Sequence, residues 1–270
     1  MVDLIRWLRN RSATSNDAPI GGAAATGFVY VAHGETGPMA SVSAGTRVGN
    51  FNDRPPWIVV DHTPQSAILA KWPGRLWKVR ILRKAPEQPL AYAAYTRATA
   101  VHVEEEVPLA VLFDHNGKAV VDLLSSVSSL SAEEKALLGR STDERAETLH
   151  NQVWTRWLSQ VDSSSPYLGQ DHSNTIAVGA RAPRSPVGNA TSVLHAELTK
   201  RARELDGDRA FVTDDEEQSF NAEWSRVASH LQHALFAIGV SPELLSPPER
   251  VALASAYRKT VPPNWPRDDA

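Results

Sequence analysis

The fold of this chain is set by residues 55–82, which read PPWIVVDHTPQSAILAKWPGRLWKVRIL. Residues 57–60 are a β-branched and aromatic run of the kind found in buried strands. Thr63 can cap a short helix over residues 65–71, because Pro64 suits a first helical position that needs no amide hydrogen. Residues 76–82 then alternate apolar and basic side chains, as a half-exposed strand does. The stretch therefore predicts a strand–helix–strand unit.

Composition describes an ordinary globular protein. The 270 residues are 42% hydrophobic and 22% charged, which is enough for one large domain or two smaller ones. A net charge of −3 lacks the basic footprint of a general nucleic-acid binder. The absence of cysteine excludes disulfides and thiol catalysis. We expect no membrane span, because no run approaches about 20 apolar residues, and a cytoplasmic location fits these features.

The strands predicted around this unit all lie in the first part of the chain. Residues 27–33 (GFVYVAH) form the first strand, and residues 40–44 could form a short one. Residues 96–107 (TRATAVHVEEEV) predict a long strand. Strict alternation would turn His102, Glu104 and Glu106 to one face and Glu105 to the valine face.

After Pro108 the pattern changes to helix. Apolar residues recur at helical spacing, and four segments match the capping box, in which a Ser or Thr is followed three residues later by Glu. These segments are Ser131–Glu134, Ser141–Glu144, Thr213–Glu216 and Ser246–Glu249. We therefore expect helices to begin at each of them, with no strand of five or more residues between Ser131 and Pro262.

The predicted fold class is α+β, with a small mixed β-sheet part followed by a mainly helical half. The expected divisions are a short helix and linker (1–26), a small α/β domain (27–115), a helical extension (116–161), a linker (162–188) and a helical subdomain (189–270). Two groups of side chains are expected to be buried. The first comprises Trp57, Trp77, Val101 and Val103, and the second Trp154, Trp157, Trp224 and Leu231.

Three polar features could carry chemistry. His33 ends the first strand, where an imidazole could orient a ribose or transfer a proton. Glu104 and Glu106, if they share one face about 7 Å apart, could stabilise an oxocarbenium-like centre. Arg75 and Arg80 belong to a basic set that could bind a phosphate. For each feature the alternative is structural: a strand-end histidine with a turn glycine, and solvated faces of strands.

His230 and His233 are spaced as metal ligands on a helix would be. The sequence offers no acidic or histidine partner at a suggestive spacing, so a structural or exposed pair is favoured. We therefore predict no metal site.

Residues 27–113 resemble small NAD-using ADP-ribosyltransferases of the rifampin-modifying type, in the order of His33-Gly34, the Trp57 strand, an alanine-containing helix and a late acidic strand. The resemblance implies that His33 holds the nicotinamide-side ribose and that Glu104 or Glu106 plays the acidic role. It also makes Trp57, Arg75 and Arg80 candidates for binding the cofactor, NAD. Two positions depart from the family pattern: Val59 replaces a stacking aromatic and Glu35 replaces a common threonine.

Residues 72–77 (WPGRLW) also look like a segment of uncharacterised actinobacterial and phage domains, a likeness that implies no activity. Two functions therefore remain open. The favoured one is an accessory protein whose helical half binds a protein partner. The alternative is an NAD-dependent ADP-ribosyltransferase-like enzyme, which requires His33 and Glu104 or Glu106 to converge on one pocket.

Overall fold

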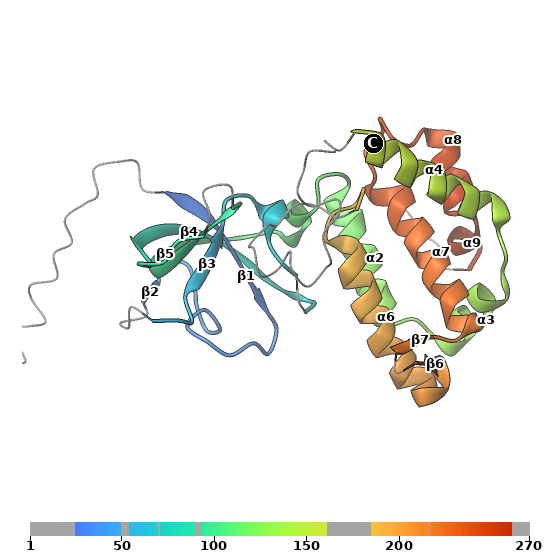
Figure 1. Ribbon diagram of the computed structural model, residues 1–270, viewed down its shortest axis with the longest axis horizontal. Coiled ribbons are helices and arrows are strands. Elements are labelled where there is room, and N and C mark those ends of the chain that lie inside the picture. The colour runs from blue at the N-terminus through green and yellow to red at the C-terminus, as the bar shows by residue number, and fades with distance from the viewer. Residues whose placement is uncertain are drawn as a thin grey trace, which may run out of the picture.

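A computed structural model describes residues 25–49, 54–69, 71–89, 93–160, 185–215 and 217–260. Five of the seven strands in these ranges come first in the chain, and the α-helices follow them together with the short hairpin of β6 (Phe211–Asp214) and β7 (Glu217–Phe220), as Figure 1 shows. The predicted α+β class is confirmed. The predicted N-terminal helix and residues 162–184 of the predicted linker lie outside the described residues. No helix within these ranges is long and apolar enough to cross a membrane.

The first half is a small barrel. Its strands are β1 (Thr26–Ala32), β2 (Arg47–Gly49), β3 (Ile58–Asp61), β4 (Gly74–Lys84) and β5 (Tyr95–Val107). β1 pairs with β3 and β4, and β5 also pairs with both, so these four strands close into a ring, with β2 added to β5. Every described pairing is antiparallel, so the sheet itself is not mixed.

Alternation along the strands gives the barrel two apolar faces. One face fills the barrel interior. Its buried residues are Val29, Val31, Met39, Val42, Val48, Ile58, Val60, Trp77, Val79, Ile81, Ala98, Val101 and Val103. On the outer face, Phe28, Tyr30 and Leu76 belong instead to the hydrophobic core of the helical half. The barrel is therefore attached to the helices through the outer surface of β1 and β4.

Two local predictions in this half are wrong. The expected helix over residues 65–71 is only a 3₁₀ turn, η1 (Pro64–Ser66), because Ala67 already returns to an extended backbone. The expected strand at residues 40–44 forms turns, and the short strand follows at β2. Both segments are too short for apolar periodicity to distinguish a helix or strand from a turn.

The helical half begins with the 3₁₀ turn η2 (Leu109–Leu112). The helices are α2 (Gly117–Val127), α3 (Ala132–Arg140), α4 (Glu144–Gln160), α6 (Ala190–Asp206), α7 (Ala222–Gly239), α8 (Pro247–Leu253) and α9 (Ser255–Thr260). A 3₁₀ turn, η3 (Gly207–Ala210), follows α6. Buried residues from before and after the predicted linker belong to one hydrophobic core, in which α7 contributes the longest buried face.

The capping predictions succeed in part. The boxes at Ser131 and Ser246 are both formed, with reciprocal side-chain and backbone hydrogen bonds. At the second predicted box, Asp143 accepts the hydrogen bond from the amide of Ala146. Thr213 is not a helix cap, because a hairpin of two four-residue strands occupies its position. The helix begins after Asn221, whose side chain accepts the amide hydrogen of Trp224.

The tryptophans divide into fully and partly buried ones. Trp77 and Trp224 are buried, with 2% and 0% of their surfaces exposed. Trp57, Trp154 and Trp157 are only half-buried, so the expectation that they are buried is wrong, although Trp154 and Trp157 pack against the helical core. The period of an apolar stripe places a side chain on the inner face of an element but does not fix how deeply it is covered.

Glu249 joins α8 to α4 and provides a test of this packing. It accepts a hydrogen bond from Arg156 at 2.7 Å and from the amide and hydroxyl of Ser246 at 2.9 and 2.6 Å. The Arg156 guanidinium, followed by Ser246, lowers the pKa of Glu249 to about 2. The charged carboxylate therefore stabilises the fold at neutral pH.

We expect Glu249→Gln to lower the free energy of unfolding by about 1–2 kcal/mol at pH 7. Because the folded pKa lies below the unfolded value, this contribution is complete above the unfolded pKa and disappears as the pH falls toward 2. Urea unfolding of the wild type and of Glu249→Gln between pH 7 and pH 2 measures how the difference in their free energies of unfolding decreases. Glu243→Gln, at an exposed position, is the control. If the loss of stability in Glu249→Gln does not depend on pH, or equals the loss in this control, Glu249 does not stabilise the fold through its charge.

Candidate functional site

Most of the residues predicted to carry chemistry lie on β4 and β5, and His33 lies just beyond the end of β1. His33 follows the last residue of β1, is exposed, and its amide donates a hydrogen bond to the carbonyl of Pro73 at 3.0 Å. Glu106 pairs in register with Trp77, which in turn pairs with Val29. Glu106 therefore lies at the height of Val29, which precedes His33 by four residues, or about 13 Å along β1. The register does not bring the histidine and this glutamate side by side.

Each glutamate of β5 instead forms an ion pair with a cation of β4. Arg75 donates to both carboxylate oxygens of Glu106, from Nε at 3.0 Å and from a terminal nitrogen at 2.6 Å. The other two contacts join Lys78 to Glu105 at 3.2 Å and Arg80 to Glu104 at 3.4 Å. We call these three pairs the ion-pair ladder. The two predicted phosphate ligands and the two predicted catalytic carboxylates neutralise each other within it.

A β-bulge explains why the predicted arrangement of Glu104 and Glu106 is wrong. The pairing steps from Lys78–Glu105 to Val79–Val103, which leaves Glu104 as an extra residue on β5. Residues paired across antiparallel strands point to the same side of a sheet. Glu106 therefore shares the face of Trp77, whereas Glu105 shares the face of Lys78. Strict alternation predicted that Glu105, and not Glu106, shares the face of the valines, because a two-residue period does not allow for an inserted residue.

The ladder also accounts for the electrostatics of this surface. The hydrogen bond from Arg75 lowers the pKa of the Glu106 carboxyl, and the same bond raises the pKa of Arg75. The guanidinium carbon of Arg75 lies 4.3 Å from the ring centroid of Trp77, so this pair covers the tryptophan. An acid held ionised by an adjacent arginine is suited to structural pairing rather than to proton transfer.

The remaining cofactor candidate, Trp57, lies apart from the ladder. It is half-buried before β3, and the guanidinium carbon of Arg97 lies 5.1 Å from its ring centroid. Its indole Nε1 is buried without a hydrogen-bond partner in the described part of the chain. An arginine already covers this ring, so a nucleotide base would have to displace it to stack there.

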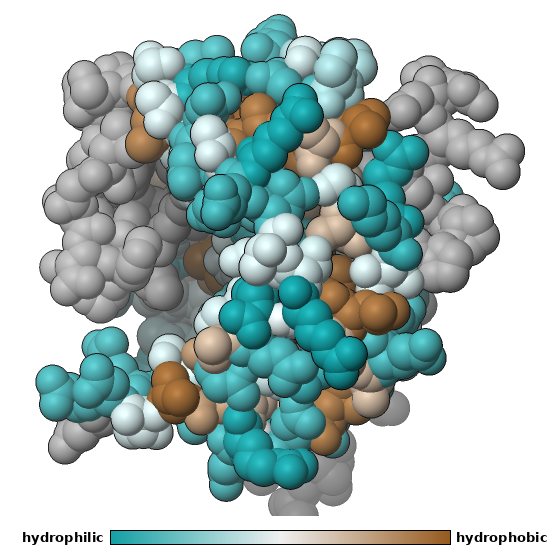
Figure 2. Space-filling view, turned by 90° about the vertical axis from the view of Figure 1, so that its right-hand side faces the viewer, coloured by the Kyte–Doolittle hydropathy of each residue, from teal (hydrophilic) through white to brown (hydrophobic). Residues whose placement is uncertain are grey.

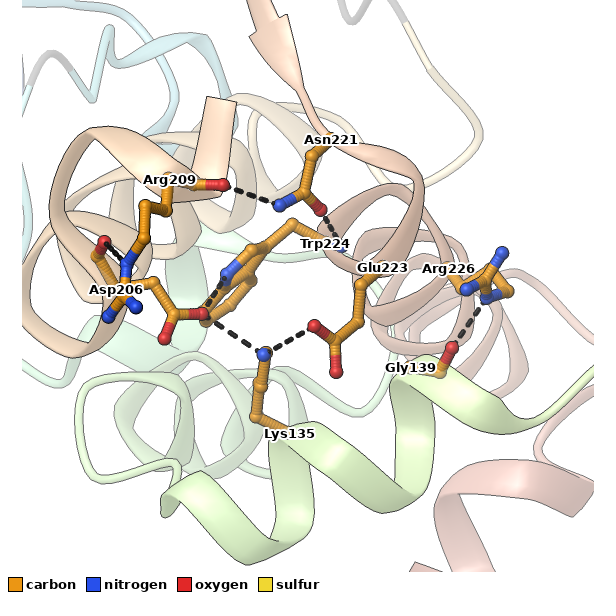
Figure 3. A network of polar contacts seen from close by, with 8 residues as sticks. All are labelled: Lys135, Gly139, Asp206, Arg209, Asn221, Glu223, Trp224 and Arg226. Carbon is orange, nitrogen blue, oxygen red and sulfur yellow. Dashed lines mark hydrogen bonds and ion pairs between the residues drawn. The ribbon is translucent and has the colours of Figure 1, made fainter. Parts of the chain in front are cut away.

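The helical half contains a denser polar network, which Figure 3 shows. Lys135 forms ion pairs with Asp206 at 3.0 Å and Glu223 at 2.6 Å, and Asp206 accepts the indole hydrogen of Trp224 at 2.8 Å. The lysine side chain is only 12% exposed. The network joins α3, α6 and α7 around a buried tryptophan. Because these charges are paired with one another, the network is suited to fixing the helices rather than to binding a substrate.

A third cluster was missed at the level of sequence. Glu147 and His150 of α4 and His233 of α7 each present a donor atom, and these atoms lie within 4.8 Å of one another. The search for partners of His230 and His233 in the sequence failed because the partners come from another helix. The imidazole Nε2 of His230 lies 3.1 Å from the carbonyl of Ser141, so that residue is directed elsewhere.

Burial favours the neutral form of both histidines of this cluster. Desolvation, and then the neighbouring His150, lower the pKa of His233 to about 4. Desolvation also lowers the pKa of His150, while Glu147 acts in the opposite direction. Neutral imidazoles are the form that binds metal ions, since a proton does not then compete for the nitrogen lone pair.

Comparison with protein family models, with curated proteins and with solved structures gives no match. The function of this chain must therefore be argued from its own residues. Among those described, the ion-pair ladder, the network around Lys135 and the cluster on α4 and α7 are the arrangements that bear on it.

If the ladder is structural, its members should affect stability slightly and in a salt-dependent way. We expect Glu104→Gln to lower the free energy of unfolding by less than about 1 kcal/mol, because both partners are partly exposed. The loss should shrink in 1 M NaCl, which has a Debye length of about 3 Å. Urea unfolding at low and high salt measures it, with Glu243→Gln as a control of equal charge change. A larger loss that persists in salt would show that Glu104 has another role.

Proposed function

We propose that this protein acts by binding a protein partner and not by transferring ADP-ribose. The observation that carries this choice is the ion-pair ladder. A transferase of the kind considered above needs a carboxylate available to the ribose and a cation available to the pyrophosphate. Here Glu106 is bound through both oxygens by Arg75, and Glu104 is paired with Arg80. A substrate would have to break these pairs before it gained any contact.

The surface we assign to the partner is the hairpin formed by β6 (Phe211–Asp214) and β7 (Glu217–Phe220). Its base is anchored by aromatic packing: the rings of Phe211 and Phe220 are stacked with centroids 5.6 Å apart, and Phe220 contacts Trp224 at 6.3 Å. Beyond that base the described residues are exposed, including Val212 at 50%. The hairpin is thus packed against the helical half at its base and exposed to solvent beyond it.

Two properties of the hairpin indicate the chemistry of its partner. The two strands pair only with each other among the described residues, so each has an outer edge that is not in a sheet. Such edges can add a further strand. Its tip is strongly acidic, since residues 214–217 read DDEE. The partner that fits is an extended, basic protein segment that adds a strand and pairs its cations with this tip.

A broad hydrophobic contact is less well supported. Figure 2 looks onto the helical end of the molecule, where apolar residues appear as small patches separated by hydrophilic ones. The exposed large apolar residues of the helical half, Leu137, Leu158, Val212 and Val251, come from four different elements. We therefore place recognition on backbone edges and charge. A cytoplasmic partner is part of the same proposal and fits a chain without cysteine.

Selection from a random peptide library tests the hairpin. We expect enriched peptides to be basic and β-prone, and to lose at least about tenfold in affinity, or about 1.4 kcal/mol, against the triple variant Asp214→Asn, Asp215→Asn, Glu217→Gln. A variant with the same charge change on other exposed residues, Asp114→Asn, Glu133→Gln, Glu243→Gln, should keep the affinity. Enriched peptides without basic residues, or equal losses in the two variants, would refute the assignment.

The protein should neither bind nor hydrolyse NAD. We expect no rise in its unfolding temperature with NAD and no release of nicotinamide, because the groups that would hold the dinucleotide are paired with each other. Saturating a site to 100 times its dissociation constant would stabilise the fold by about 2.7 kcal/mol, so binding would be readily detected. A rise in temperature together with NAD turnover that Glu106→Gln abolishes would restore the enzyme hypothesis.

A further inference from the structure

We propose that Glu147, His150 and His233 form a binding site for a divalent transition-metal ion, with Zn²⁺ the best match. The proposal concerns the helical half and is independent of the hairpin. Two imidazoles and one carboxylate are a ligand set that zinc accepts, and three protein ligands leave a fourth position for water. Calcium and magnesium prefer oxygen ligands, so the two nitrogens argue against them.

The helices place the three ligands together. Glu147 and His150 are three residues apart on α4, so both lie on one side of that helix. His233 faces them from α7. The ring centroids of His150 and His233 are 5.1 Å apart, and all three donor atoms lie within 4.8 Å of one another. The site therefore needs small rotations of side chains and no rearrangement of the helices.

One distance already has the value that a metal would impose. Nε2 of His233 and a carboxylate oxygen of Glu147 are 3.3 Å apart. Two ligands bound to zinc at about 2.0–2.1 Å with a tetrahedral angle are separated by about 3.3 Å. A metal ion can thus take the place of the hydrogen between these two atoms without moving them apart, and the neutral ring of His233 then carries its hydrogen on Nδ1. His150 is the ligand that must adjust.

Burial distinguishes this cluster from a chance meeting of surface groups. His233 is only 3% exposed, and its Nδ1 is buried without a hydrogen-bond partner in the described chain. The side chain of Glu147 is 55% exposed, which gives an ion a route from solvent.

The surrounding charges favour a cation. Asp143 lies close enough to His230 and His233 to interact electrostatically with both. Its own carboxylate accepts hydrogen bonds from the amide of Ala146 and the hydroxyl of Ser255, so it acts from a distance rather than as a ligand.

The fluorescence of Trp154 should report metal binding. Its indole nitrogen donates a hydrogen bond to Nε2 of His150 at 3.2 Å. If the metal binds at Nε2, the lone pair is no longer available to the indole. If it binds at Nδ1, the proton of the ring moves to Nε2, which again cannot accept. Either mode breaks the bond between Trp154 and His150, so metal binding must change the environment of this tryptophan.

The test uses the full chain, freed of metal with a chelator, and ZnCl₂ as the probe. We expect one Zn²⁺ per chain by calorimetry and a change in tryptophan emission on binding. Glu147→Gln should weaken binding by about tenfold or more. Glu144→Gln, one turn away on the same helix, should leave it unchanged. Trp154→Phe should retain binding but lose the emission change.

Three results would overturn the proposal: a dissociation constant above about 1 mM for the wild type, equal binding by Glu147→Gln and Glu144→Gln, or an emission change that survives in Trp154→Phe. Glu147 is exposed, so its variant is expected to fold. Circular dichroism of each variant confirms that a loss of binding is not a loss of structure. His195→Gln, at an exposed histidine, controls for binding to the surface.

Discussion

The pairing of β4 with β5 is the interaction on which the first half of this protein depends. It closes the ring of strands, encloses one hydrophobic core, and aligns three cations with three carboxylates. The bulge at Glu104 is a single inserted residue, and it sets which cation of β4 each carboxylate of this acidic run meets.

The sequence was informative where many residues repeat one pattern. β-branched alternation located the long strands, and helical stripes with capping residues located most helices. It failed at residues 211–220, where Thr213–Glu216 matches a helix start. There Phe211 stacks on Phe220, nine residues later in the sequence but its direct neighbour across a hairpin, and this contact favours strands. Local propensity is a weak guide when a tertiary contact opposes it.

The candidate sites show the same limit. The basic residues of β4 and the acidic residues of β5 are each visible in the sequence, and a solvated face was recognised as one reading of both. Their mutual pairing depends on strand register, which a bulge shifts. The ligand cluster is hidden in a similar way: Glu147 with His150 and His230 with His233 are two helical pairs, and only the packing of α4 on α7 shows that one member of the second pair completes the first.

The outer surface of β1 and β4 has a further consequence for how the molecule unfolds. Phe28, Tyr30 and Leu76 belong to the core of the helical half although their strands enclose a separate core of their own. Neither half can therefore lose its structure without exposing apolar surface of the other. The stabilities of the two cores are therefore coupled, and the chain should unfold as a single cooperative unit. Cleavage between the barrel and the helices would yield fragments that aggregate through exposed apolar surface and not two independently folded domains.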